Sequence, residues 1–159
     1  MTHRLPRAPV RPLSPAAYLR VDDAARVIAF YITVFGATEV VRLVEPTGRV
    51  AHAELRLGAA GDASLMLSDE LPEFDLLGPR ARGRCTIALM LYVHDVDAIC
   101  GAAVHAGATL IKPPADDPFG DRAAKLIDPC GREWLVATRI ADVSPDEMTS
   151  RFAAMFGPS

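Results

Sequence analysis

Apolar and polar residues follow one another along the chain in an order that occurs twice. Near the start, Leu19-x-Val21-x-Asp23 alternates and leads into a helical pattern that stops at Gly36-Ala37-Thr38. Further on, Leu91-x-Val93-x-Asp95 leads into a second helical pattern that stops at Gly107-Ala108-Thr109. An internal repeat predicts the arrangement of helices and strands before a role is assigned to any single residue. Two half-modules that bury their apolar faces against each other predict one domain, with a pseudo-symmetric cleft between them.

The first copy predicts a strand, a helix and three further strands. Alternation of apolar and polar residues is typical of strands with one buried face, whereas apolar positions spaced by three and four indicate a helix. Asp23 is a good N-cap for that helix, and Gly36 is a good left-handed stop. The expected elements are strands at 16–21, 40–44, 51–57 and 64–67 and a helix over 24–35.

The second copy repeats this order, with Asp95 as the helix cap and Gly107 as the stop. The stretch 113–121 contains two successive prolines and is expected to be a loop. The expected elements are strands at 86–93, 109–112, 123–127 and 133–138 and a helix over 96–106. The fold class is therefore α+β: tandem βαβββ modules, at 15–68 and 85–140, form a curved, partly open mixed sheet around a cleft.

Three segments lie outside the repeats. Residues 1–14 are rich in arginine and proline and lack an apolar core, so we expect a flexible arm rather than a signal peptide. Residues 69–84 are non-periodic and are expected to link the modules. In the last segment, 141–159, Ser144-Pro145-Asp146-Glu147 forms a capping box that predicts a C-terminal helix. The apolar side of this helix is expected to pack on its own domain or on a partner subunit.

Composition narrows the class of protein. A chain of 159 residues with half of them hydrophobic fits one folded domain. The net charge of −3 gives no reason to expect a nucleic-acid partner, which would need a clustered basic face. The apolar stretches are shorter than the roughly 18 residues needed to cross a membrane. Three cysteines without a CxxC spacing suit free thiols in a cytoplasmic protein.

Several motifs occur in an order that resembles a known family. They are Val21-Asp22-Asp23, Phe30-Tyr31, Phe35-Gly36 and the stretch Asp128-Pro129-Cys130-Gly131-Arg132-Glu133-Trp134. Over residues 15–140 the chain resembles the vicinal oxygen chelate superfamily of glyoxalases, bleomycin-resistance proteins and extradiol dioxygenases. Phe119-Gly120-Asp121-Arg122, together with His52-Ala53-Glu54-Leu55, looks most like the PhnB-like branch.

The resemblance implies two sheets that face each other across a small-molecule cleft, and a homodimer. The modules of one cleft come from one chain or from two swapped chains, and both arrangements stay open. In metal-dependent members four strand residues hold a divalent cation, and these positions fall here on Ala16, Glu54, Ala88 and Leu135. Because three of the four side chains have no lone pair to offer, we expect no metal cofactor. A displaced site made of His52, Glu54 and Glu133 is the alternative.

The candidate site residues lie on the strand faces that point away from the helices. Glu54 and His52 are the candidate catalytic acid and base. Arg122 is expected at the mouth of the cleft, where its guanidinium could bind an anion. The expected ligand-binding residues are Tyr18, Arg20, Arg56, Met90, Tyr92, Arg122, Glu133 and Leu135.

Each of these residues also has a purely structural interpretation. A one-sided sheet normally turns polar residues toward water. Glu54 could pair with Arg20 or Arg56, and Arg122 with Asp121 or Asp128. Trp134 is expected in the core, Cys130 as an inert thiol, and His94 as a surface residue.

Two functions from different classes follow. The first is a metal-independent binding protein for a metabolite or an antibiotic. The second is a lyase, isomerase or dioxygenase-type enzyme, glyoxalase-like, that uses Glu54 and His52 as metal ligands or as acid and base. A structural dimer without a small ligand is a third possibility.

Overall fold

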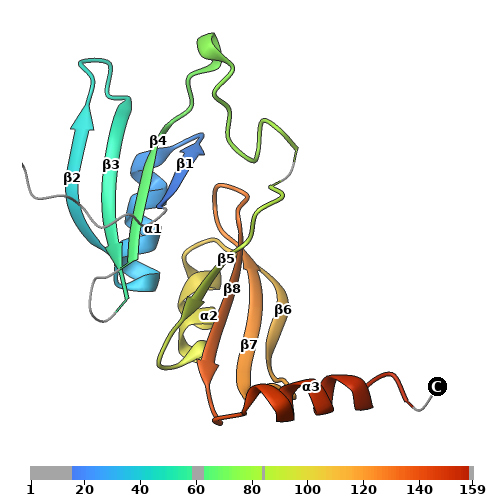
Figure 1. Cartoon of the computed structure of the whole chain (residues 1–159). Coiled ribbons are helices and arrows are strands. Elements are labelled where there is room, and N and C mark those ends of the chain that lie inside the picture. The colour runs from blue at the N-terminus through green and yellow to red at the C-terminus, as the bar shows by residue number, and fades with distance from the viewer. Residues whose placement is uncertain (1–15, 59–62, 84, 158–159) are drawn as a thin grey trace, which may run out of the picture.

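Two four-stranded sheets with the same strand order form the framework (Figure 1). The computed structural model describes residues 16–58, 63–83 and 85–157, so the predicted arm at 1–14 lies outside the described residues. The first sheet contains β1 (Ala17–Val21), β2 (Thr38–Val44), β3 (Val50–Leu57) and β4 (Ala63–Asp69), in the order β1-β4-β3-β2. The second contains β5 (Leu89–Tyr92), β6 (Thr109–Asp116), β7 (Asp121–Ile127) and β8 (Glu133–Arg139), in the order β5-β8-β7-β6.

The tandem βαβββ fold predicted from the repeat is therefore confirmed. In each sheet the first strand runs parallel to the fourth, and the remaining neighbours are antiparallel. The parallel pair is possible because a helix connects the first strand to the second in each module. These helices are α1 (Ala24–Phe35) and α2 (Val96–His105).

The helix caps act as the sequence predicts. The carboxylates of Asp23 and Asp95 accept hydrogen bonds from the backbone N–H groups of Arg26 and Ala98, three residues further on. Gly36 ends α1 with a φ of 65°, a left-handed conformation that glycine adopts without steric cost. Leu19, Val21, Leu55 and Leu67 are buried between the first sheet and α1, and Leu126, Trp134 and Val136 are buried in the second module.

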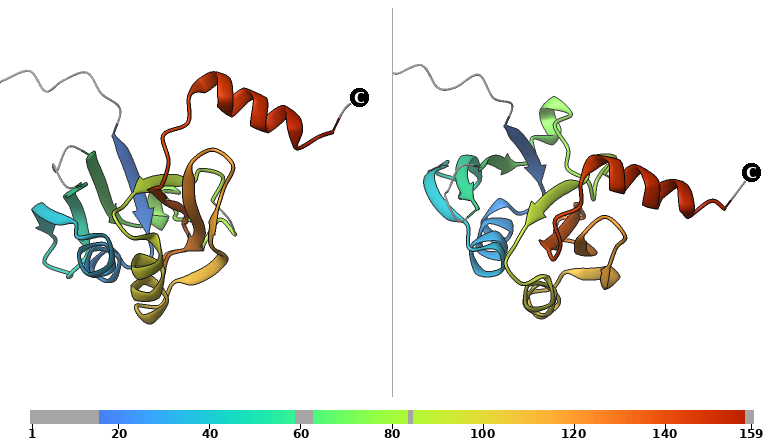
Figure 2. Two further views of the ribbon diagram at one scale, coloured as in Figure 1. Left: turned by 90° about the horizontal axis from the view of Figure 1, so that it is seen from below. Right: turned by 60° about the horizontal axis from the view of Figure 1, so that its bottom comes forward.

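The modules are joined through their helices and not through a shared sheet. Both views of Figure 2 show α1 and α2 next to each other, and the two helices are in contact. The ring of Trp134 lies 5.3 Å from that of Tyr31 and 4.7 Å from that of Phe35, measured between centroids. An aromatic cluster from α1 and β8 therefore fixes one module against the other.

The segment 113–121 differs from its prediction. Pro113 and Pro114 belong to β6, which runs to Asp116, and β7 already begins at Asp121. The two prolines are tolerated because β6 is an edge strand and its register with β7 shifts between Leu110 and Lys112 and again between Lys112 and Ala115. The strand expected at 86–93 is shorter, at 89–92.

The linker and the tail complete the chain. The connection between the modules contains a short 3-10 turn, η1 (Pro72–Phe74), and a bridge between Leu71 and Leu76. The predicted C-terminal helix is present as α3 (Pro145–Ala154), which projects from the second module (Figure 1) and buries none of its own residues. Arg151 of α3 donates a 2.7 Å hydrogen bond to the backbone carbonyl of Pro118. No helix among the described residues is long and apolar enough to cross a membrane.

Candidate functional site

The open face of the first sheet carries a small polar and aromatic group. The hydroxyl of Tyr18 and Nδ1 of His52 are 3.1 Å apart. The guanidinium of Arg20 lies over the Tyr18 ring, 4.7 Å from its centroid, and donates a hydrogen bond to the Ser68 hydroxyl. These side chains come together because strands β1, β4 and β3 are neighbours and residues two apart share a face.

Glu54 is the enclosed carboxylate of this face, with 3% of its surface exposed. Arg56 donates a 3.0 Å hydrogen bond to its carboxylate, and the Ser64 hydroxyl donates one of 3.3 Å. Of the two partners expected for Glu54, the structure therefore selects Arg56, two residues along the same strand. A carboxylate bound by a cation and a hydroxyl is less available to act as a general base than one that faces a substrate directly.

The open face of the second sheet is built around Asp121. Tyr92 donates a 2.8 Å hydrogen bond to Oδ2 of Asp121, and this bond raises the pKa of the Tyr92 phenol. Nε of Arg139 lies 2.9 Å from Oδ1 of Asp121 as an ion pair, although no hydrogen bond reaches that buried oxygen. Met90 and Leu135 are neighbours in register, and Glu133 pairs with Lys125 at 2.9 Å. Asp121 and Arg139 were absent from the predicted set.

Arg122 has a different place from the one predicted. It alternates with Asp121 along β7, so its side chain points to the helix side of the sheet. There it contacts Asp97 in the first turn of α2, at 2.7 Å, and Asp116 in β6, at 2.8 Å. The hydrogen bonds from Arg122 lower the pKa of the Asp97 carboxyl. Arg122 thus ties α2 to the sheet instead of standing at a cleft mouth, and its partners are neither Asp121 nor Asp128.

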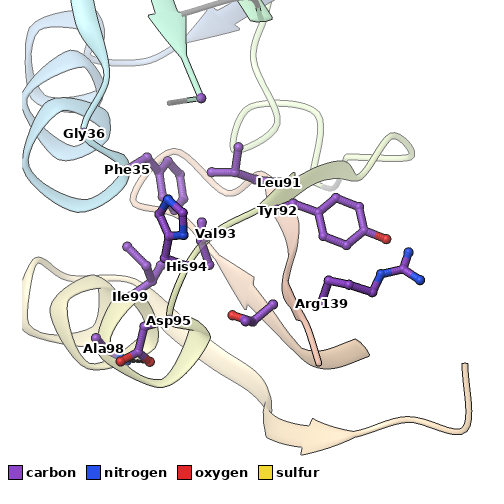
Figure 3. Close-up of a pocket in the computed structure, with 12 residues that line it drawn as sticks. Phe35, Gly36, Leu91, Tyr92, Val93, His94, Asp95, Ala98, Ile99 and Arg139 are labelled. Atoms are coloured by element: carbon purple, nitrogen blue, oxygen red, sulfur yellow. Dashed lines mark hydrogen bonds between the residues drawn. The ribbon is translucent and has the colours of Figure 1, made fainter. Parts of the chain in front are cut away.

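A groove of about 720 Å³ lies between the modules (Figure 3). We call it the inter-module groove. The first module contributes the end of α1 and Gly58, which follows β3. The second contributes residues 91–95, the start of α2 and the end of β8. Leu91, Ile99 and Phe35 form apolar walls. The polar side chains along the groove are those of Tyr92, His94, Asp95, Thr138 and Arg139. In Figure 3 Tyr92 and Arg139 lie together, apart from His94 and Phe35.

The predicted site residues are therefore divided between separate surfaces. Tyr18, Arg20, His52, Glu54 and Arg56 lie on the first sheet, whereas Met90, Tyr92, Glu133 and Leu135 lie on the second. Tyr92 is the predicted residue that also lines the inter-module groove, and Tyr18 and Arg20 line a second, smaller hollow. Phe35, His94 and Arg139 were not predicted as site residues. Each lies at or next to the end of a helix or strand, where the spacing of apolar residues does not show the direction of a side chain.

The family's metal positions do not fit a cation here. Ala16, Ala88 and Leu135 carry hydrocarbon side chains, which leaves Glu54 as the sole donor of the four. Within the described part of the chain, no group of three or more His, Cys, Asp or Glu residues could hold a metal ion. The alternative set of His52, Glu54 and Glu133 is split between the two sheets.

The paired-module fold, with polar and aromatic side chains on open sheet faces, defines the class of protein to which this chain is related. The chain belongs to the Glyoxalase/Bleomycin resistance protein/Dioxygenase superfamily, whose family model matches residues 13–136. The uncharacterized protein Mb0911c of Mycobacterium bovis is 34% identical over 145 residues, which cover 89% of this chain and 92% of that protein.

Solved structures show the same fold. The protein PA1353 of Pseudomonas aeruginosa superposes with a TM-score of 0.63 at 20% identity, covering 80% of this chain and 98% of the other. A PhnB protein of Bacillus cereus gives a TM-score of 0.60 at 17% identity, with coverages of 78% and 98%. At such identities the likeness extends to the fold alone.

Proposed function

We propose that the chain binds a small organic molecule in the inter-module groove and does so without a metal ion. The observation that carries this proposal is the groove itself. Its volume of about 720 Å³ suits a metabolite-sized ligand, since ligand sites typically span roughly 300–1,000 Å³ and combine apolar walls with a few polar groups. Both modules contribute to its lining, so the groove depends on the packing of one module against the other.

The lining favours a molecule with an apolar body and an acidic or hydrogen-bond-accepting end. Burial of the body against Leu91, Ile99 and Phe35 would supply about 25 cal/mol per Å² of apolar surface. At the polar end, Asp121 contacts both Tyr92 and Arg139 and restrains their side chains. The remaining N–H groups of Arg139 suit a carboxylate or a sulfonate, because the guanidinium is planar and rich in donors.

The proposal is tested with N-phenylnaphthylamine, a neutral dye that fluoresces in apolar sites. Ala98 lines the groove at the exposed first turn of α2, so Ala98→Glu places a charge in the groove without disturbing the core. Ala102→Glu, on an exposed position of the same helix outside the groove, is the matched control. We expect saturable dye binding that is lost in Ala98→Glu and kept in Ala102→Glu. Equal binding by both variants would contradict a site in the groove.

Metal independence has its own test. Dye affinity should be the same before and after dialysis against a chelator, because the neutral dye binds to the apolar walls of the groove. A loss of binding that added zinc or manganese restores would instead support the enzyme alternative. That alternative has one observation in its favour, the enclosed Glu54 carboxylate on the open face of the first sheet.

We further propose that the chain belongs to the PhnB-like branch and forms a homodimer. Support for the branch comes from the motifs Phe119-Gly120-Asp121-Arg122 and His52-Ala53-Glu54-Leu55, together with the fold likeness to the PhnB protein. Support for the dimer comes from large side chains exposed on the open sheet faces, Tyr18, Met90 and Tyr92, and on α3, Phe152 and Met155. Light scattering at micromolar concentration should give twice the chain mass of 17.1 kDa, and a single-chain mass would contradict the dimer.

A further inference from the structure

A second hollow, of about 290 Å³, lies between β1 and the connection that joins the two modules. We call it the arginine pocket, because Arg20 of β1, Arg82 of the connection and Arg132 of the turn before β8 all line it. Tyr18, Cys85 and Thr86 complete its polar lining. None of its lining residues is shared with the inter-module groove, so the arginine pocket is a separate feature of the chain.

The positive charge of the pocket is incompletely neutralised. No Asp or Glu is present among the described residues that line it. Arg82 pairs with Asp75 at 2.9 Å on the exposed rim. Neither Arg20 nor Arg132 forms an ion pair with any residue in the described ranges, and Arg20 bonds instead to the neutral hydroxyl of Ser68. Like charges that converge on one small hollow repel each other and attract an anion.

Arg132 gives the strongest indication that the pocket is built to hold a ligand. Only 7% of its surface is exposed. Nη1 donates a 3.2 Å hydrogen bond to the thiol of Cys85, while the buried Nε has no hydrogen-bond partner. Burial of a guanidinium N–H without a hydrogen-bond acceptor is costly, because the group loses its hydration and gains little in return. An anion in the pocket would add a negative charge close to this guanidinium.

We propose that the arginine pocket binds a small oxyanion of the carboxylate or phosphate class. Guanidinium groups recognise both through paired N–H donors, and charge-assisted hydrogen bonds of this kind are about twice as strong as neutral ones. The volume of about 290 Å³ suits a free small anion or the anionic end of a larger molecule. The carboxylate of Glu70 accepts the backbone N–H of the lining residue Gly78 at 2.6 Å.

Cys85 provides a direct readout of occupancy. It lines the pocket, whereas Cys100 and Cys130 are buried with 4% and 1% exposure, so alkylation of the folded protein should report Cys85. At constant ionic strength, inorganic phosphate or acetate should slow the alkylation of Cys85 by neutral iodoacetamide. The anion that protects at the lower concentration identifies the class. Absence of protection by both anions would overturn the proposal.

Variants separate a specific site from a general charge effect. Arg20→Gln removes a donor from the pocket, and the protecting anion should then bind about tenfold more weakly, as expected for the loss of one charged hydrogen bond. Arg42→Gln is the matched control, because Arg42 lies on β2 at the opposite edge of the first sheet and its loss changes the net charge equally. Equal protection in wild type, Arg20→Gln and Arg42→Gln would overturn the proposal. Dye binding in the inter-module groove should be unchanged in Arg20→Gln, which keeps this test independent of the proposed function.

Discussion

The hydroxyl of Tyr31 donates a 2.6 Å hydrogen bond to Oδ2 of Asp128, which lies 97 residues further along the chain. Both residues are buried, at 0% and 3% exposure. Asp128 also accepts hydrogen bonds from the indole N–H of Trp134, from the thiol of Cys130 and from the backbone N–H groups of Cys130 and Arg132. One carboxylate therefore organises the turn between β7 and β8 and holds α1 of the first module against it. The walls of the inter-module groove depend on this contact.

Removal of the Tyr31 hydroxyl should weaken the connection between the modules. Tyr31→Phe keeps the ring packing but deprives Asp128 of one donor, so the free energy of unfolding should fall by about 2 kcal/mol. Tyr18→Phe, which alters an exposed phenol, should change it by less than about 0.5 kcal/mol. Urea unfolding followed by the fluorescence of Trp134 measures both. Equal stability of the two variants would show that the Tyr31–Asp128 bond contributes little.

Stability should fall at alkaline pH in a way that depends on Cys130. Burial, and next the Asp128 carboxylate, raise the pKa of the Cys130 thiol well above its ordinary value. The folded chain therefore keeps this proton, whereas the unfolded chain releases it above about pH 8.5. Above that pH the group should lower the free energy of unfolding by up to about 1.4 kcal/mol per pH unit. Burial also raises the pKa of Tyr31, so a second decline should begin near pH 10.

The variant Cys130→Ala tests this assignment. Its free energy of unfolding should decline less steeply than that of the wild type between about pH 8.5 and 10, because the titrating thiol is gone. Below that window the two proteins should differ by a constant amount. Urea unfolding at several pH values measures the slopes, and identical slopes would show that another group is responsible.

The elements of the fold could be predicted because their signals are local. Asp23, Asp95 and Gly36 mark helix ends through backbone hydrogen bonds within a few residues. Because the sequence pattern repeats, the elements of the first module also predict those of the second. The boundaries of β6 and β7 were harder to predict from the sequence. Pro113 and Pro114 indicate a loop unless the strand is known to lie at a sheet edge. That misplaced boundary left Arg122 in a loop and hid its contact with Asp97.

The candidate site was harder to predict because it depends on how the modules pack. Strand alternation correctly separates the open faces from the helix faces, as Glu54 and Trp134 show. It does not show that Phe35 and His94 border one groove, because their approach follows from distant contacts such as Tyr31 with Asp128. The arginine pocket likewise combines β1, the connection and a turn, which no periodic pattern relates.

Glu54→Gln separates a structural role of Glu54 from a functional one. The variant keeps the shape of the side chain but removes the charge that Arg56 and Ser64 bind, so stability should fall by about 1–3 kcal/mol. Affinity for N-phenylnaphthylamine should stay within about twofold, since Glu54 does not line the inter-module groove and distant sites act nearly independently. Dye titration of the folded variant measures this, and loss of dye binding would relocate the ligand to the face of the first sheet.

Arg122→Gln should affect stability slightly and dye binding not at all. Its partners Asp97 and Asp116 are more than half exposed, and exposed ion pairs contribute roughly 0–1 kcal/mol. The difference from wild type should shrink in high salt, because salt screens such pairs. Thermal unfolding at low and high salt measures this. A weaker affinity for anionic dyes in this variant would restore Arg122 as a ligand-binding residue.

Arg139→Gln tests the polar end of the inter-module groove. Two dyes share the same apolar body: N-phenylnaphthylamine is neutral, and anilinonaphthalene sulfonate adds an anionic group. If the guanidinium of Arg139 binds the anionic end of a ligand, the variant should lose about tenfold in affinity for the sulfonate. It should bind the neutral dye as the wild type does, since Leu91, Ile99 and Phe35 are unchanged. The same titrations on Arg122→Gln control for the loss of one positive charge. A parallel loss of both dyes in Arg139→Gln would mean that the ion pair with Asp121 shapes the groove without contacting the ligand.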